Sequence, residues 1–201
     1  MNTSRSDQSQ FLAHFTKGVN AYDNIVSILT DKCIRAGILH WSNRPAVCFT
    51  ECPWPSLVKH AEQYSPFGVG FNKPHIFGAG GGPAYYVRAD HFDKQDWADH
   101  VMTFVTPFWP AYRPKTLRGK EHLGGKTVDY SHEREWRVPH DFRFDHSDVE
   151  FVVLKSYEDL ARFPKPLKDA IGRDKFILVE IYRNIEKLWP THILRPLKKA
   201  V

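Results

Sequence analysis

Near its middle the chain reads Glu133-Arg134-Glu135-Trp136-Arg137. This run predicts a strand, in which Glu133, Glu135 and Arg137 share one face and the residues between them share the other. Two carboxylates so close together repel each other unless a cationic ligand or an arginine compensates them. The pattern therefore favours a functional site. The plain alternative is a ladder of ion pairs among Glu133, Glu135 and Arg137, with Arg134 facing solvent across the sheet.

Other apolar runs, bounded by glycine, proline or polar residues, also predict strands. These runs cover residues 11–15, 46–49, 66–71, 84–87, 151–154 and 176–181. The glycine-rich segment 77–83 predicts a turn that would join 66–71 and 84–87 as a hairpin. Apolar spacing predicts helices over residues 19–36, 56–63, 90–107, 157–163 and 167–171.

The length and composition predict one α+β domain over residues 11–201, preceded by a flexible N-terminus of residues 1–10. The 201 residues include 14 prolines and 12 glycines, which a helical bundle or a coiled coil would not accept. The order of elements predicts a bent or split, mainly antiparallel sheet with flanking helices. No apolar run approaches the roughly 20 residues of a membrane helix, and the polar start resembles no secretory signal. We therefore expect a cytoplasmic protein without a membrane partner.

The formal net charge of +5 makes a polyanion a plausible partner, although the same charge also keeps a small protein soluble. Basic residues gather in the long segment 113–129, whose length is typical of a functional lid or a linker. A nucleic acid is the ligand or acceptor that these cations would suit. The candidate nucleic-acid-binding residues are Arg113, Lys115, Arg118, Lys120 and Lys126.

Several common site motifs are missing from the sequence. The glycine cluster 78–82 lacks the lysine-serine ending of a P-loop, and no nucleophile elbow is present. The histidines show no H-E-x-x-H spacing, and Cys48 and Cys52 have no second pair to complete a zinc site. We therefore expect no metal. Cys48 lies within an apolar strand, where a thiol is normally inert.

A constellation of polar residues remains. His14 ends the first predicted strand, Thr50 and Glu51 end the second, and the two glutamates of the opening motif lie on a later one. That order resembles the ADP-ribosyltransferase superfamily, whose split sheet clamps NAD. The Glu-x-Glu spacing is similar to that of the arginine-modifying branch, which implies that Glu135 is catalytic and that Glu133 activates the acceptor.

The same resemblance implies the residues that bind NAD as the substrate. His14 and Thr16 would lie on its adenosine-ribose and diphosphate side, and Arg44 would pair with a phosphate. Thr50 stands in place of the family's Ser-Thr-Ser element, and Tyr85 or Tyr86, with Tyr86 as the candidate, would contact nicotinamide. Each residue also has a plain interpretation: His14 as a hydrogen-bonded histidine beside the sheet, and Thr50 and Glu51 as ordinary residues at a strand exit.

At a finer level, residues 11–140 resemble the AbiGi-like group of bacterial abortive phage infection proteins. The resemblance implies an NAD-consuming effector of phage defence or of a toxin–antitoxin system, which modifies nucleic acid or protein and has a cognate toxin or antitoxin as partner. Hydrolysis of NAD with water as acceptor would use the same pocket. The alternative is a non-catalytic protein, either antitoxin-like or nucleic-acid-binding, in which exposed aromatic residues such as Trp109 stack on bases.

Overall fold

The computed structural model describes residues 8–51, 61, 65–109, 129 and 131–188. Its centre is one mixed sheet in which all neighbouring strands are antiparallel except β11 and β12, which are parallel. The order is β12 (Phe176–Leu178), β11 (Phe151–Leu154), β5 (Gly68–Asn72), β1 (Phe11–Phe15), β4 (Pro45–Thr50), β9 (Glu135–Val138) and β6 (Gly82–Pro83), with β3 (Gly37–Ile38) paired to β4. The structure therefore confirms the expected mainly antiparallel sheet with flanking helices.

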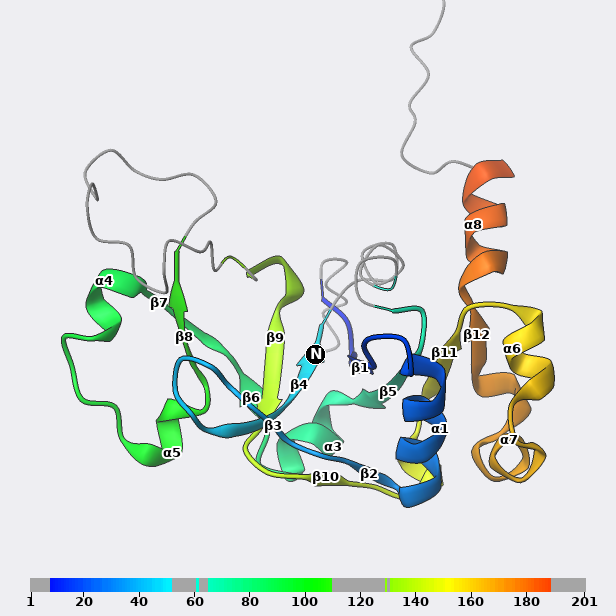
Figure 1. The fold of residues 1–201 in the computed structure, drawn as a ribbon, viewed down its shortest axis with the longest axis horizontal. Coiled ribbons are helices and arrows are strands. Elements are labelled where there is room, and N and C mark those ends of the chain that lie inside the picture. The colour runs from blue at the N-terminus through cyan, green and yellow to red at the C-terminus, as the bar shows by residue number, and fades with distance from the viewer. Residues whose placement is uncertain (1–7, 52–60, 62–64, 110–128, 130, 189–201) are drawn as a thin grey trace, which may run out of the picture.

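Two short ladders flank the main sheet. β2 (Cys33–Ile34) pairs with β10 (Phe142–Arg143) in antiparallel fashion, and β7 (Tyr85–Arg88) pairs with β8 (Val105–Phe108) in parallel. Helices α4 (Ala89–Phe92) and α5 (Asp99–Met102) accompany β7 and β8 at one end of the molecule (Figure 1). We call the segment Tyr85–Phe108 the side layer.

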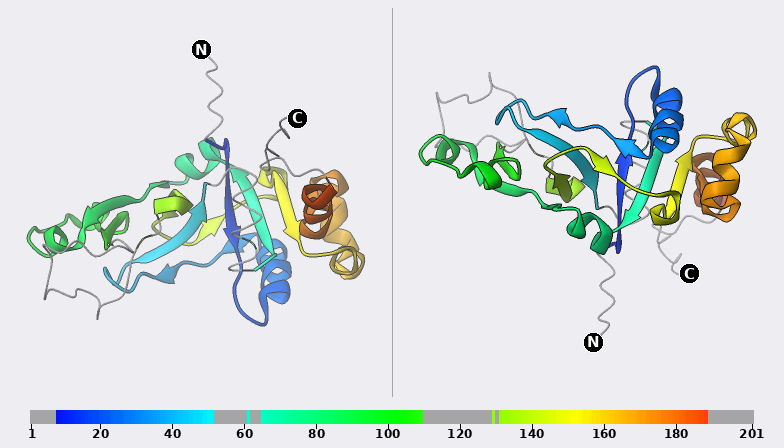
Figure 2. Two further views of the ribbon diagram at one scale, coloured as in Figure 1. Left: turned by 90° about the horizontal axis from the view of Figure 1, so that it is seen from above. Right: turned by 90° about the horizontal axis from the view of Figure 1, so that it is seen from below.

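The remaining helices lie along the main sheet and at its other end. They are α1 (Ala21–Asp31), α3 (Lys73–Gly78), α6 (Tyr157–Arg162), α7 (Lys165–Ile171) and α8 (Val179–Leu188), with 3-10 turns η3 (Ser131–Glu133), η4 (His146–Asp148) and η5 (Arg173–Lys175). Figure 2 shows α6, α7 and α8 beside β11 and β12, opposite the side layer. None of the described helices is long and apolar enough to cross a bilayer.

The core packs α1 and aromatic side chains against the middle strands. Ile25 and Leu29 of α1 are fully buried, and Phe71 contacts the rings of Phe142 and Phe144 with centroids 5.0 and 4.9 Å apart. Rings at these separations and steep angles add to the free energy of burial. The sheet that carries the polar constellation is therefore anchored on one continuous apolar cluster.

β5 shows why its glycines are needed. It lies between β1 and β11, and a Cβ atom at Gly70 would come 2.2 Å from the ring of Phe151. The predicted hairpin between 66–71 and 84–87 is therefore wrong. Gly70 makes room for the ring of Phe151, which lies on a strand some 80 positions later, whereas Gly68 lies against Phe15 of β1. Helix α3 separates β5 from the side layer.

Two predicted elements are shorter than the sequence indicated, and a third is wrong. The helix over 19–36 ends at Asp31, because Lys32 takes a left-handed backbone with φ of 49° and Cys33–Ile34 pairs with β10. The helix over 90–107 is wrong, since α4 and α5 are single turns and Val105–Phe108 is a strand. The strand over 176–181 ends at Leu178, where α8 begins. The predicted helix 56–63 falls almost wholly outside the described residues.

Candidate active site

The polar constellation meets at three neighbouring strands. β1, β4 and β9 are adjacent in the sheet, with Ala13 opposite Thr50 and Thr50 opposite Glu135. A cavity of about 400 Å³ lies over them, within the size range of small-molecule sites. Its lining residues are Ala13, His14, Phe15, Lys17, Ile38, Leu39, His40, Trp41, Cys48, Phe49, Thr50, Glu133 and Glu135. Four residues predicted to form the site therefore share one cavity: His14, Thr50, Glu133 and Glu135.

His14 presents a neutral imidazole to this cavity. Its Nδ1 lies 2.9 Å from the carbonyl oxygen of Cys48, which can only accept, so Nδ1 carries the proton. Burial is the main cause that lowers the pKa of His14 below 6.5, the nearby charge of Lys17 lowers it further, and the bond to the carbonyl opposes both. In the neutral ring Nε2 is then an acceptor, suited to a ligand hydroxyl or to a proton.

Glu133 reaches the cavity from a turn and not from the strand. It ends η3, and Arg134 after it has a φ of 45°, so the predicted alternation along one strand begins only at Glu135. The Thr50 hydroxyl donates to the Glu133 carbonyl at 2.7 Å, and the Glu51 amide donates to the same oxygen at 3.1 Å. Thr50 thus holds the turn that carries Glu133.

Glu135 makes an ion pair within its own strand. Arg137 Nη2 lies 2.7 Å from Glu135 Oε2, and Arg137 Nε lies 3.0 Å from Oε1. The ion-pair interpretation of the motif is thus correct for these two residues. The Glu135 side chain nevertheless keeps 11% of its surface exposed and lines the cavity. The same carboxylate therefore belongs both to the ion pair and to the cavity wall.

Cys48 of β4 lies opposite Arg137 of β9 and also lines the cavity. Burial raises the pKa of its thiol far above the usual range, and the adjacent Glu135 carboxylate, to which the thiol is hydrogen-bonded, raises it further. A thiolate is therefore disfavoured, so Cys48 contributes a neutral surface and no nucleophile.

The other predicted ligands lie elsewhere. Thr16 is buried, with its hydroxyl 2.7 Å from the Ala21 carbonyl oxygen and 3.2 Å from that of Phe67, so it braces the start of α1 and does not line the cavity. Arg44 forms an ion pair with Asp99 of the side layer. Tyr86 lines a separate, smaller cavity that Glu135 and Trp136 also line, and burial, followed by the nearby Glu135 charge, raises the pKa of its phenol.

The basic residues proposed for nucleic-acid binding, at positions 113–126, lie outside the described residues. The expectation of an exposed Trp109 is wrong: its side chain is buried and packs against Ala89, so it presents no open face to a base. Within the described part of the chain no three histidine, cysteine or acidic side chains are grouped so that they could hold a metal ion.

Sequence reasoning missed the loop that covers the cavity. His40 and Trp41 line it because the chain turns back between Leu39 and Arg44, whose amide and carbonyl form a 2.9 Å hydrogen bond. Asn43 supplies the left-handed backbone for this turn, with φ of 52°. Asn43-Arg44-Pro45 is a typical turn sequence, but nothing local indicates which cavity the neighbouring residues will line.

Comparisons with protein-family models, with curated proteins and with solved structures gave no match, so the function proposed below is inferred from the site itself.

Proposed function

We propose that this protein is an NAD-consuming, ADP-ribosyltransferase-like effector of bacterial phage defence or of a toxin–antitoxin system. The observation that supports it is the meeting of His14, Thr50, Glu133 and Glu135 over adjacent strands around one cavity. At such a cavity one carboxylate can stabilise an oxocarbenium-like ribose, a second can take a proton from the acceptor, and a neutral imidazole can accept a hydrogen bond from a ribose hydroxyl. The AbiGi-like and ADP-ribosyltransferase-like resemblances of the sequence point the same way.

In the proposed reaction the bond between nicotinamide and ribose C1′ breaks, and its electron pair leaves with nicotinamide, which becomes neutral. The ribose gains oxocarbenium character, which the Glu135 carboxylate stabilises. An acceptor hydroxyl or amine, or water, then adds at C1′, and its proton passes to Glu133. His14 accepts a hydrogen bond from a ribose hydroxyl through Nε2. The acceptor would be a nucleic acid or a protein.

The test is incubation with NAD labelled on its adenylate phosphate in bacterial extract, with nicotinamide release and label transfer measured together. The parent should release nicotinamide and label one class of macromolecule, identified by its sensitivity to nuclease or protease. Glu135→Gln should lower both readouts by about 100-fold or more, as expected when a group that stabilises transition-state charge is lost. Glu133→Gln should lower transfer more than release.

The matched control is Glu158→Gln, at an exposed position on α6 beside the far end of the sheet. It should behave as the parent. Melting curves of all variants show whether each remains folded. An inert parent, or a folded Glu135→Gln protein with parental activity, would reject the proposal.

Binding can be checked without turnover. NAD should raise the melting temperature of the parent, and of Glu135→Gln less. Stabilisation by an oligonucleotide alone, falling steeply with salt, would instead favour the non-catalytic nucleic-acid-binding alternative.

A further inference from the structure

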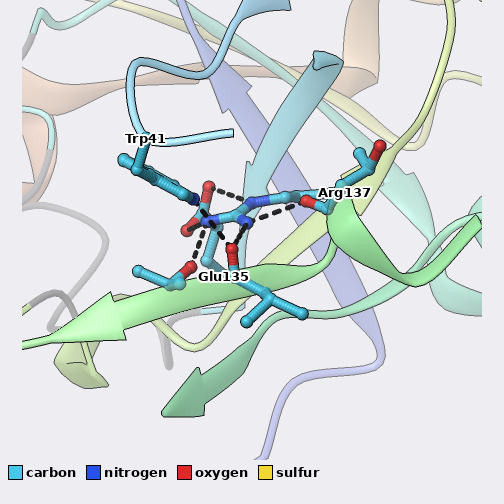
Figure 3. A network of polar contacts seen from close by, with 6 residues as sticks. Trp41, Glu135 and Arg137 are labelled. Atoms are coloured by element: carbon cyan, nitrogen blue, oxygen red, sulfur yellow. Dashed lines mark hydrogen bonds and ion pairs between the residues drawn. The ribbon is translucent and has the colours of Figure 1, made fainter. Parts of the chain in front are cut away.

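Arg137 is the largest side chain that is fully buried in the described part of the protein, and each of its five N–H groups has an acceptor within reach. The Nε–H group and one N–H of Nη2 donate hydrogen bonds to the two carboxylate oxygens of Glu135. The other N–H of Nη2 donates to Thr106 Oγ1 at 2.6 Å (Figure 3). Nη1 donates to the Thr103 carbonyl oxygen at 2.9 Å and to the Val105 carbonyl oxygen at 3.4 Å. The guanidinium is thus held by the side layer on one side and by Glu135 on the other.

The pair is asymmetric with respect to the cavity. Arg137 has no exposed surface, whereas the Glu135 carboxylate retains some and lines the cavity. The guanidinium carbon Cζ of Arg137 lies over the Trp41 ring, 5.1 Å from the centroid of that ring. Trp41 also lines the cavity. A ligand in the cavity therefore meets the carboxylate and the indole, while the positive charge stays behind them.

A guanidinium that binds a carboxylate through two parallel N–H groups fixes the plane of that carboxylate as well as its distance. A carboxylate has about four lone-pair sites, so the two that Arg137 occupies leave others for a ligand hydroxyl. Because an unpaired buried guanidinium is strongly unfavourable, Arg137 also keeps Glu135 from rotating away.

We propose that Arg137 is a positioning residue that orients the Glu135 carboxylate toward the cavity and is itself fixed by the main-chain carbonyls and Thr106 of the side layer. This role deepens the proposed function and, in its kinetic form, rests on it. The alternative is an ion pair that stabilises the fold without affecting the geometry of the cavity.

The variant that separates these roles is Arg137→Lys. Lysine keeps the positive charge but offers three donors from a single atom, so it cannot form the two parallel bonds. In a folded Arg137→Lys protein we expect kcat for nicotinamide release to fall by about 10- to 100-fold with little change in KM, since misplacing a reacting group by about 1 Å costs rate on this scale. Crystal structures of parent and variant should show a displaced or multiply oriented Glu135 carboxylate.

The control is Arg162→Lys, which changes an arginine on α6 that pairs with Asp159 and stacks on Tyr22, away from the cavity. It should keep the parental kcat. A Glu135 carboxylate that stays in place in folded Arg137→Lys overturns the proposal whether or not the protein turns over NAD. Unchanged kcat in that variant overturns it too. An inert parent rejects the proposed function, and the crystal structures still decide the role of Arg137.

Discussion

At the scale of single residues, His14 links the site to the pH dependence of stability. Its folded-state pKa lies below 6.5, the value expected in the unfolded chain, so the unfolded chain binds the proton first on acidification. The contribution of His14 to stability is therefore fully present above pH 6.5 and declines as the pH falls below it.

We predict that the free energy of unfolding falls more steeply between about pH 8 and pH 5 in the parent than in His14→Gln, which cannot take up the proton. Urea denaturation across this range gives the comparison. An exposed histidine offers the control: His140→Gln should keep the parental slope. Equal slopes for the parent and His14→Gln would contradict a lowered pKa of His14.

Cys48 gives a second prediction at this scale. Burial and the neighbouring Glu135 carboxylate disfavour its thiolate, which is the form that reacts with alkylating reagents. We expect mass spectrometry to find Cys48 unmodified by iodoacetamide in the native protein at about pH 8 and fully modified in urea. Rapid alkylation of Cys48 in the folded state would show that the thiol is more acidic than its surroundings indicate.

At the scale of secondary-structure elements, β5 depends on a glycine. A methyl group at position 70 would overlap the Phe151 ring, so either β11 or the ring must move. We predict that Gly70→Ala lowers the free energy of unfolding by about 1–3 kcal/mol, as is typical of overpacked cores. Denaturant titration measures it.

Gly78→Ala is the matched control, because a Cβ atom there meets nothing within 4 Å and the backbone has no positive φ. It should be neutral or slightly stabilising. The double variant Gly70→Ala/Phe151→Ala should lose less stability than the sum of its two single variants, because the removed ring is what the added methyl would overlap. Additive losses would place the strain elsewhere.

At the scale of the whole molecule, the side layer is joined to the main sheet next to the candidate site. Trp41 Nε1 donates to the Val105 carbonyl at 2.8 Å, and Arg137 donates to Thr103, Val105 and Thr106. Arg44 and Asp99 add an exposed ion pair between the same two parts, which contributes little in water. Loss of a hydrogen bond at this junction should therefore loosen both the cavity wall and the side layer.

We predict that Trp41→Phe, which removes the indole donor, increases hydrogen–deuterium exchange in residues 103–108 and leaves residues 68–72 of β5 unchanged. Trp97→Phe is the matched control, since it removes an indole bond to the Phe92 carbonyl within the side layer. Its effect should stay near residues 92–97. Unchanged exchange in β8 of Trp41→Phe would show that the indole does not join the two parts.

The sequence by itself determined the elements whose signals are local. The apolar strands β1, β4 and β11 and the helices α6 and α7 lie close to where the apolar runs and spacing predicted them. It also singled out His14, Thr50, Glu133 and Glu135, through the order of polar residues along the predicted strands and the Glu-x-Glu spacing. Their roles as ligands and catalysts remain predictions.

Only the tertiary structure decided which strands are neighbours and which side chains share the cavity. The short β2 depends on β10, more than 100 positions away, and Gly70 is explained only by Phe151. Trp41 reached the cavity wall through the turn at residues 39–44, and Arg137 became buried only because the side layer supplied acceptors for its N–H groups. The physical reason is that burial and pairing depend on contacts between distant segments, which no local pattern encodes.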